Sequence, residues 1–134
     1  VTPSPVRGYF SAKYVDPDFI GERTSARPFL IRYSDIALVF AEAAGPDEGL
    51  ALVNEIRRRA GIPDLPEGMS LSEFRKAVIQ ERTLELAFEG NRLYDLRRTA
   101  SVTTTVPEAT KLSEEQAAFY PIPQRELDLN PNVK

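Results

Sequence analysis

Three glutamates at four-residue intervals form the densest group of reactive side chains in the sequence. Glu81, Glu85 and Glu89 occupy positions i, i+4 and i+8, so in a continuous helix they share one face. Carboxylates grouped in this way can bind a metal ion or act as the acid and base of a hydrolase. Helical carboxylate metal sites normally add a histidine, and the sequence has none. We therefore expect structural ion pairs, whose other members are Arg32, Arg82, Arg92, Asp95 and Arg97.

A second candidate is Glu42, which lies between Ala41 and Ala43. Small neighbours allow another helix to approach closely, which would partly bury Glu42 and require a cationic partner. Arg32, or one of the three arginines at 57–59, could supply that partner. A buried pair of this kind fixes geometry more than it adds stability, so we interpret Glu42 as structural.

Aromatic residues gather in the first thirty positions, outside any helical periodicity. They are Tyr9, Phe10, Tyr14, Phe19 and Phe29. Such rings can form a platform for a sugar ring, and equally often they pack against neighbouring helices. The absence of Trp weakens the platform interpretation. Tyr9, Phe10 and Tyr14 remain the candidate ligand-binding residues.

Composition excludes several classes of function. The 134 residues include 17 Lys and Arg against 20 Asp and Glu, a net charge of -3, which gives no basic footprint for a nucleic acid. Without Cys or His there is no thiol or imidazole catalysis and no zinc site of the usual type. No phosphate-binding glycine loop is present. We expect a mostly helical protein that is not an enzyme and uses no cofactor.

The spacing of apolar residues predicts a helical core over residues 33–98. Residues 34–44 and 46–60 form two amphipathic segments, with Gly45 and Pro46 at their junction. Helices joined by so short a connection form an antiparallel hairpin.

A longer helix is predicted over residues 70–89, opened by a capping box in which Ser70 and Glu73 cap each other. A shorter helix follows over residues 91–97. Ser34 or Asp35 is expected to cap the first helix of the hairpin.

The apolar positions of these helices are expected to face the core. They are Ile36, Ala37, Phe40, Ala43, Ala44, Leu50, Val53, Ile56, Ala60, Phe74, Ala77, Val78, Leu84 and Phe88. Segment 1–32 is expected to be extended or loop, and segment 99–134 to be a loop followed by an extended tail. With the helical core over residues 33–98, these two segments are predicted to form a single domain over residues 1–134.

Four motifs in order resemble those of the SusD/RagB family. They are LIRYSD with FAEA (residues 30–35 and 40–43), NEIRRRAGIP (54–63), ERTLELAFEGNRLYDLR (81–97) and YPIPQRELDLNP (120–131). The resemblance departs from the family pattern at Ser34 and Asp35, where Ala and Glu are usual.

The resemblance implies a scaffold of tetratricopeptide-like antiparallel hairpins, here as the C-terminal portion of a longer protein. Family members are surface-exposed lipoproteins of the cell outer membrane, anchored through a lipidated N-terminal Cys that this sequence does not include. They bind glycans or other nutrients and work with a SusC-like TonB-dependent transporter. No ligand residue is carried over from the family, because the matched motifs look like scaffold.

Two other classes of function remain open. The chain could be a helical-repeat module that binds another protein and has no ligand of its own. It could also be a hydrolase that uses Glu81, Glu85 or Glu89. A raised carboxyl pKa in an open cleft would favour the hydrolase, whereas an arginine contact on each carboxylate would not.

Overall fold

The computed structural model describes residues 11–119, 121–130 and 132, and its contacts divide the chain into two compact units after Gly90. The first unit contains three helices, α1 (Tyr33–Ala44), α2 (Pro46–Arg59) and α3 (Leu71–Glu85). The second contains the short helices α4 (Arg92–Arg98), α5 (Val102–Thr105), η1 (Pro107–Lys111), α6 (Glu114–Ala118) and α7 (Gln124–Leu129). No strand forms among the described residues, and the mostly helical fold predicted from the sequence is confirmed.

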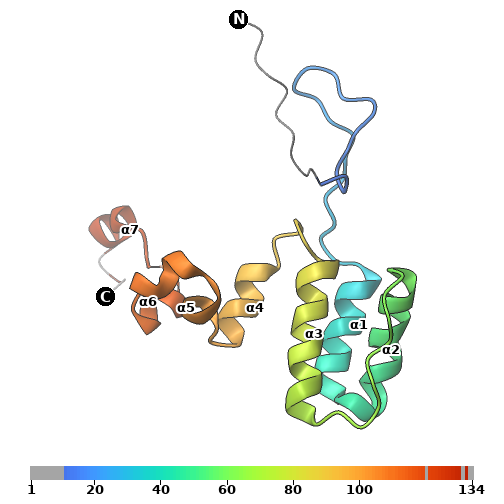
Figure 1. Cartoon of the computed structure of the whole chain (residues 1–134). Helices are drawn as coiled ribbons and strands as arrows, with labels where there is room; N and C mark the ends of the chain where they lie inside the picture. Colours follow the sequence, from blue (N-terminus) through green and yellow to red (C-terminus); the bar gives the residue numbers. More distant parts are fainter. Residues whose placement is uncertain (1–10, 120, 131, 133–134) are drawn as a thin grey trace, which may run out of the picture. The chain divides into compact units, whose positions relative to one another are not determined.

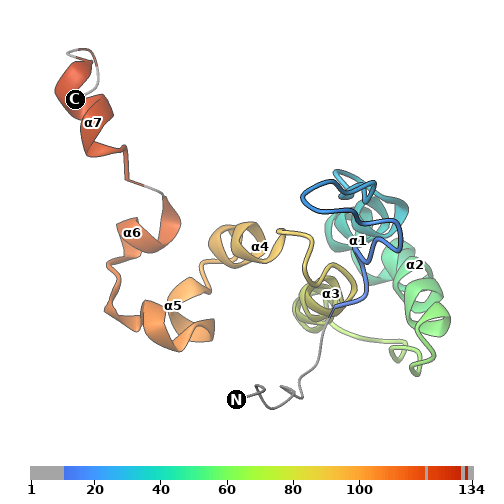
Figure 2. The ribbon, with the colours of Figure 1, turned by 90° about the horizontal axis from the view of Figure 1, so that it is seen from above.

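The first unit is a bundle with α1 at its centre (Figure 1). Helices α1 and α2 form the predicted antiparallel hairpin, and residues 60–70 then run back along α2 to the start of α3 (Figure 1). Helix α3 is therefore antiparallel to α1 and parallel to α2. Viewed close to their axes, the three helices form a triangle (Figure 2). This order brings the start of α1 and the end of α3 to the same end of the bundle.

The ends of the three helices follow from local sequence signals. Gly45 adopts a φ of 86° between α1 and α2, and Pro46 begins α2 at the first helical position. The capping box of α3 is formed as expected, because Ser70 Oγ accepts from the Glu73 amide and Glu73 accepts from the Ser70 amide.

The expected cap of the first helix is wrong. Helix α1 begins at Tyr33, and its N-cap position is held by Arg32, whose side chain makes no capping hydrogen bond. The hydroxyl of Ser34 instead accepts a hydrogen bond from Arg32 Nη1 at 2.9 Å. Ser34 is therefore buried inside the first turn as a partner of that arginine.

The core of the first unit lies where the three helices meet. Its fully buried side chains are Leu38, Val53, Phe74 and Val78, joined by Ala37, Ala41 and Ile56. The predicted burial of Val53, Ile56, Phe74 and Val78 is correct. The predicted burial of Ile36, Phe40, Leu84 and Phe88 is wrong, since each is about half exposed or more. Three further positions predicted to face the core are also exposed: Ala43, Ala44 and Ala60.

Two physical reasons account for the exposure of Ile36, Phe40 and Phe88. Helix α1 carries apolar side chains on nearly all sides, so periodicity alone could not tell which side packs on α2 and α3. Helix α3 ends at Glu85, four residues earlier than predicted, and Phe88 adopts a left-handed φ of 66° in the turn that follows. That turn directs Phe88 to solvent instead of continuing the buried stripe.

The second unit corrects the expectation for residues 99–134. In place of a loop and an extended tail, the described part of this segment holds α5, η1, α6 and α7. Their buried side chains, with Leu96 of α4, are Val102, Ala109 and Ala117. Helices of four to six residues span too few turns to show a period. One signal was available, because Ser113 and Gln116 form a second capping box.

The close approach of Gly49 in α2 to Ala41 in α1 predicts a large loss of stability from a small substitution. A Cβ atom on Gly49 would lie 2.7 Å from both Cα and the carbonyl oxygen of Ala41. We expect Gly49→Ala to lower the free energy of unfolding by about 1–3 kcal/mol through overpacking, although alanine is otherwise the better helix former by about 1 kcal/mol.

Urea unfolding at 25 °C measures this effect. Ala51→Gly, at an exposed position of α2, is the matched control that gives the intrinsic helix term alone. A Gly49→Ala variant as stable as wild type or more stable would contradict the close packing of α1 and α2.

Candidate functional site

The side chain of Arg32 is the centre of a cluster of charged groups at one end of the bundle. Its Nε and Nη2 bind the two carboxylate oxygens of Glu89, each at 2.9 Å. Its Nη1 binds Glu85 Oε1 at 2.6 Å and Ser34 Oγ at 2.9 Å, and Nη2 also binds the carbonyl oxygen of Glu85 at 2.7 Å. All five N–H donors of the guanidinium are therefore used.

The early end of α3 explains how two glutamates reach one arginine. Glu85 is the last helical residue, and Glu89 follows in a turn that contains the positive φ angles of Phe88 and Gly90. The expectation that Glu81, Glu85 and Glu89 share one helical face is thus wrong for Glu89. The turn folds Glu89 back, so that its side chain meets Glu85 at Arg32.

The remaining charges pair across helices with partners that differ from those expected. Arg57 at the end of α2 binds Glu81 at 2.7 Å, and Arg59 binds Glu85. Arg82 of α3 binds the side chain of Asp35 in the first turn of α1 at 2.8 Å.

The other predicted members of the network lie in different surroundings. The backbone carbonyl of Glu42 accepts from Arg75 at 3.3 Å. In the second unit, Asp95 is buried and accepts from Arg98, and Arg97 donates to the carbonyl of Ala117. Arg92 begins α4.

The electrostatics of the cluster oppose acid catalysis. Burial alone would raise the pKa of Glu85, but hydrogen bonds from Arg32, Arg59 and Ser34 outweigh it and hold the pKa below its ordinary value. Hydrogen bonds from Arg32 and Lys13 likewise lower the pKa of Glu89. The same contacts raise the pKa of Arg32. A general acid at neutral pH needs the opposite shift.

A surface loop, residues 14–31, is fastened at both ends to this cluster. At one end Lys13 Nζ binds the Glu85 carbonyl at 2.7 Å and also the Glu89 carboxylate. At the other end Arg32 binds the side chains of Glu85 and Glu89. Both contacts, which we call the two clamps, act on Glu85 and Glu89, so the ends of the loop are held together.

Asp16 holds the interior of the loop together. Its carboxylate accepts hydrogen bonds from Thr24 Oγ1 at 2.8 Å, Ser25 Oγ at 3.0 Å, and the backbone amides of Ser25 and Asp18. These bonds, that from Thr24 above all, lower the pKa of Asp16 to about 2. Asp16 therefore stays ionised at all physiological pH values.

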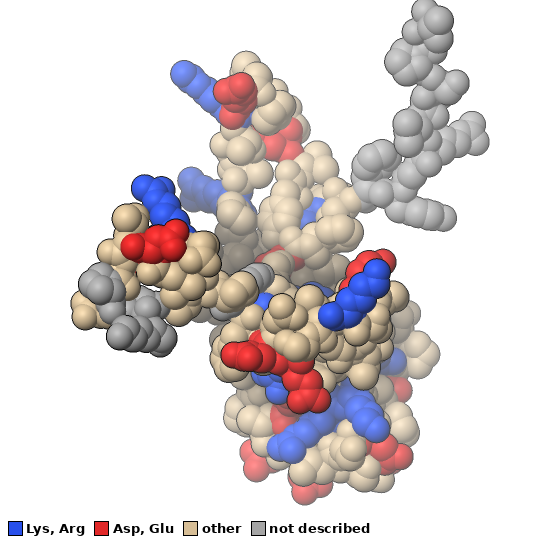
Figure 3. All heavy atoms as spheres, turned by 90° about the vertical axis from the view of Figure 1, so that its left-hand side faces the viewer, with Lys and Arg blue, Asp and Glu red and all other residues tan. Residues whose placement is uncertain are grey.

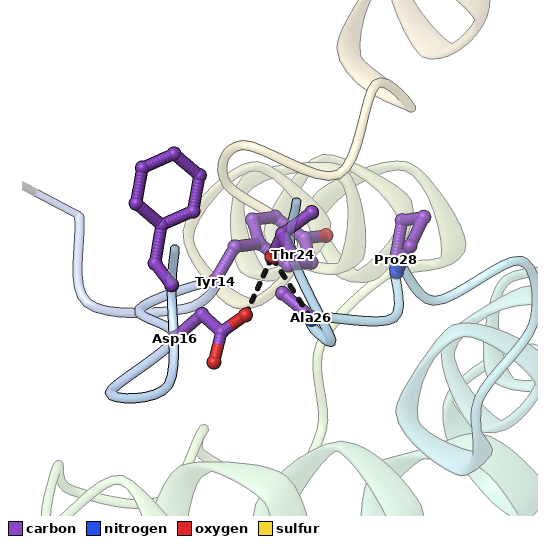
Figure 4. Close-up of a pocket in the computed structure, with 6 residues that line it drawn as sticks. Tyr14, Asp16, Thr24, Ala26 and Pro28 are labelled. Atoms are coloured by element: carbon purple, nitrogen blue, oxygen red, sulfur yellow. Dashed lines mark hydrogen bonds between the residues drawn. The ribbon is translucent and has the colours of Figure 1, made fainter. Parts of the chain in front are cut away.

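Residues of the loop line a pocket of about 530 Å³ that is open to solvent (Figure 4). Its lining residues are Tyr14, Asp16, Phe19, Thr24, Ala26 and Pro28. Tyr14 is half-buried and its ring lies 6.3 Å from that of Phe29, while Phe19 is exposed. Since Asp16 and Thr24 bond to each other (Figure 4), the pocket offers mainly apolar and aromatic surface.

The structure places one of the three residues of the predicted aromatic platform. Tyr14 lies in the pocket, whereas Tyr9 and Phe10 lie outside the described residues. Sequence reasoning did not single out Asp16 and Thr24. An Asp followed by Thr and Ser at eight and nine residues is too common a spacing to have identified them.

Acidic and basic side chains are interspersed on the face shown in Figure 3. Among the described residues, no group of Asp and Glu is arranged to hold a metal ion. No helix in the described part of the chain is both long and apolar enough to cross a membrane.

Comparisons with known proteins identify the family. The model of the SusD family matches residues 2–111. The chain belongs to the SusD family. It is 36% identical to SusD-like protein P2 of Formosa agariphila over 90 residues, covering 58% of the chain and 18% of that protein. SusD-like protein P38 of the same organism is 31% identical over 117 residues, covering 78% of the chain and 23% of that protein.

A solved structure supports the same assignment. The crystal structure of a SusD homolog from Bacteroides thetaiotaomicron aligns with a TM-score of 0.67 and 34% identity, over 82% of this chain and 27% of that one. The chain thus spans about a fifth to a quarter of the length of the SusD-like proteins it matches. The region matched by the family model includes the Arg32 cluster and the loop it holds.

At position 32, a positive charge without the five N–H donors of arginine should not maintain the stability of the protein. We expect Arg32→Lys to lower the free energy of unfolding by about 1–3 kcal/mol, because three ammonium donors cannot satisfy the buried oxygens that five guanidinium donors reach. Urea unfolding provides the measurement. Arg75→Lys, at an exposed arginine of α3, is the matched control and should change stability little. Equal effects of the two substitutions would count against the cluster.

The lowered carboxyl pKa values also predict how stability depends on pH. Glu85 and Glu89 take up protons more readily in the unfolded chain, where their pKa is about 4.5, than in the folded one. Their contribution is thus complete above about pH 5 and is lost as the pH falls through 4.5 and below.

We expect the free energy of unfolding to decline from about pH 5 to pH 3, and the double variant Glu85→Gln, Glu89→Gln to decline less steeply. Urea titrations at a series of fixed pH values give the free energy of unfolding of wild type and of the double variant, and hence the slope of each against pH. Glu48→Gln, which removes an exposed carboxylate of α2, serves as the control. An unchanged slope in the double variant would contradict the assigned pKa shifts.

Proposed function

We propose that this chain is the helical scaffold portion of a longer SusD-type protein that binds a glycan or similar nutrient at the cell surface. The observation that carries the proposal is the family match over residues 2–111. In this proposal the longer protein is held at the outer membrane by a lipid anchor outside these residues and passes its ligand to a TonB-dependent transporter. The chain itself is not an enzyme and needs no cofactor.

The geometry supports a scaffold more than a catalytic role. Glu81, Glu85 and Glu89 each accept a hydrogen bond from an arginine. Carboxylates engaged in this way hold helices together and are not available as an acid and a base. A hydrolase built on these glutamates is therefore disfavoured by their arginine partners, and the lowered pKa values of Glu85 and Glu89 also count against it.

The loop pocket is the part of the chain best suited to touch a ligand. Sugar rings present apolar faces that pack on aromatic rings, and pockets that bind small molecules are concave, largely formed in advance and mostly apolar. Tyr14 and Phe19 line such a pocket, and Asp16 with the two clamps holds the loop in shape. We assign this pocket an auxiliary role, with the main ligand contacts made by the rest of the longer protein.

Calorimetry of the longer protein and of this chain against the same panel of glycans tests the proposal. We expect the longer protein to bind at least one glycan and this chain alone to bind it weakly or not at all. In the longer protein, Tyr14→Ala with Phe19→Ala should weaken binding by at most about tenfold, or 1.4 kcal/mol. Val15→Ala, an exposed loop position outside the pocket, is the control.

Three outcomes would change the assignment. Binding of no glycan by the longer protein would contradict the proposed function. Equal affinity in the chain alone would move the main site into these residues. Reproducible glycan turnover that is lost in a Glu81→Gln, Glu85→Gln variant would place the protein among the hydrolases.

A further inference from the structure

A groove lies between α2 and the segment that connects it to α3. Residues 60–70 run back along α2 without forming a helix (Figure 1). Side chains of the two elements line a groove of about 590 Å³, which we call the α2 groove. It shares no lining residue with the loop pocket beside Tyr14. The α2 groove is therefore a separate candidate site, and its role does not depend on the glycan-binding function proposed above.

Hydrogen bonds to α2 fix the outer wall of the α2 groove. Asn54 is buried, and its side chain binds both backbone groups of Leu65. Oδ1 accepts from the Leu65 amide at 2.7 Å, and Nδ2 donates to the Leu65 carbonyl at 3.2 Å. Arg57 Nε donates to the carbonyl of Pro63 at 2.7 Å. Pro63 and Pro66 further restrict the backbone near these points, so the groove is formed before a ligand arrives.

The floor of the α2 groove is apolar. Leu50 of α2 lines it together with Leu65 and Met69 of the connecting segment. All three side chains are half-buried and pack against the core of the first unit. A methionine side chain is flexible and can adapt to apolar groups of different shapes. The floor can thus receive apolar side chains of a ligand, which lose contact with water when they pack on it.

The rim of the α2 groove is acidic. Asp47, Asp64 and Glu67 contribute three carboxylates against the one guanidinium of Arg58, which leaves a net charge of -2. Arg58 Nε lies 3.4 Å from a carboxylate oxygen of Asp64, so this cation already has a partner. Asp47, in the first turn of α2, and Glu67 form no ion pair within the described part of the chain. These two carboxylates therefore differ from those of the Arg32 cluster, which all have cationic partners.

We propose that the α2 groove binds a basic polypeptide segment of a partner protein, in which lysine or arginine alternates with apolar residues. The cations lie beside Asp47 and Glu67, and the apolar side chains pack on Leu50 and Met69. An acidic segment is excluded, because it brings like charges together at the rim. A small cation without apolar groups leaves the floor in contact with water. A chain that carries both kinds of side chain matches the whole groove.

Fluorescence polarisation with the longer protein and labelled peptides tests the proposal, without glycan or transporter. The probe is a short peptide in which lysine alternates with leucine. One comparison peptide has glutamate in place of lysine, and a second has serine in place of leucine. The protein variant Asp47→Asn, Glu67→Gln removes both unpaired carboxylates of the rim. Its matched control is Glu48→Gln, Glu55→Gln, which removes two exposed carboxylates of α2 that do not line the groove.

We expect the lysine–leucine peptide to bind and the glutamate–leucine peptide not to bind. The Asp47→Asn, Glu67→Gln variant should bind the lysine–leucine peptide about three- to tenfold more weakly, and the control variant should change the affinity less than about twofold. Binding to wild type should weaken as the NaCl concentration is raised from about 50 to about 500 mM. Glu67→Gln alone replaces the double variant if that protein does not fold.

Three results would overturn the proposal. The first is no binding of the lysine–leucine peptide at concentrations up to about 1 mM. The second is equal weakening in the two variants, which would show attraction to the charge of the whole protein and not to the α2 groove. The third is equal binding of the lysine–serine peptide, because the apolar floor would then have no part in recognition. Since no glycan is present, each result is independent of whether the protein binds one.

Discussion

The guanidinium of Arg32 uses all five of its N–H groups on three partners, and the first unit depends on this arrangement. The residue sits at the N-cap of α1 and binds Ser34 in the first turn. It also binds the side chains of Glu85 and Glu89 and the backbone of Glu85, at the end of α3. One side chain thus joins the start of α1 to the end of α3 and to the turn that follows it.

Such a cluster specifies geometry more than it supplies net stability. The side chains of Glu85 and Glu89 are 10% and 3% exposed, so their charges lose much of their hydration. The Coulombic gain offsets that loss only when the hydrogen bonds are complete. Arg32, Arg59 and Lys13 together complete the hydrogen bonds of the two carboxylates. Removing one member leaves charge buried without a partner, and for that reason a conservative replacement is costly here.

The same cluster connects the scaffold to the part of the chain that could meet a ligand. Lys13 and Arg32 hold the ends of the loop on the turn after α3, and Asp16 holds its interior. The pocket beside Tyr14 and Phe19 is therefore shaped before any ligand arrives. A loop arranged in advance loses less conformational entropy on binding. In the proposed function, the structural ion pairs therefore hold in place the loop that carries the binding surface.

The helices that have strong local signals could be predicted from the sequence. The features that depend on contacts between distant residues could not. The hairpin at Gly45 and Pro46 and the capping box at Ser70 could be predicted because each signal is contained in a few neighbouring residues. The end of α3 could not, since Leu86 to Glu89 have no helix breaker before Gly90 and the turn is in contact with Arg32, more than fifty residues earlier. The buried side of α1 was ambiguous for a different reason, because both of its sides are apolar.

Arg32 holds the ends of the loop and the end of α3 in place. This role can be measured by hydrogen–deuterium exchange in the longer protein and in its Arg32→Ala variant. We expect faster exchange in the variant at amides of residues 15–31 and 86–90, with little change at the core of α2 around Val53. If exchange in the loop and the turn were unchanged in a variant that remains folded, Arg32 would not have this role.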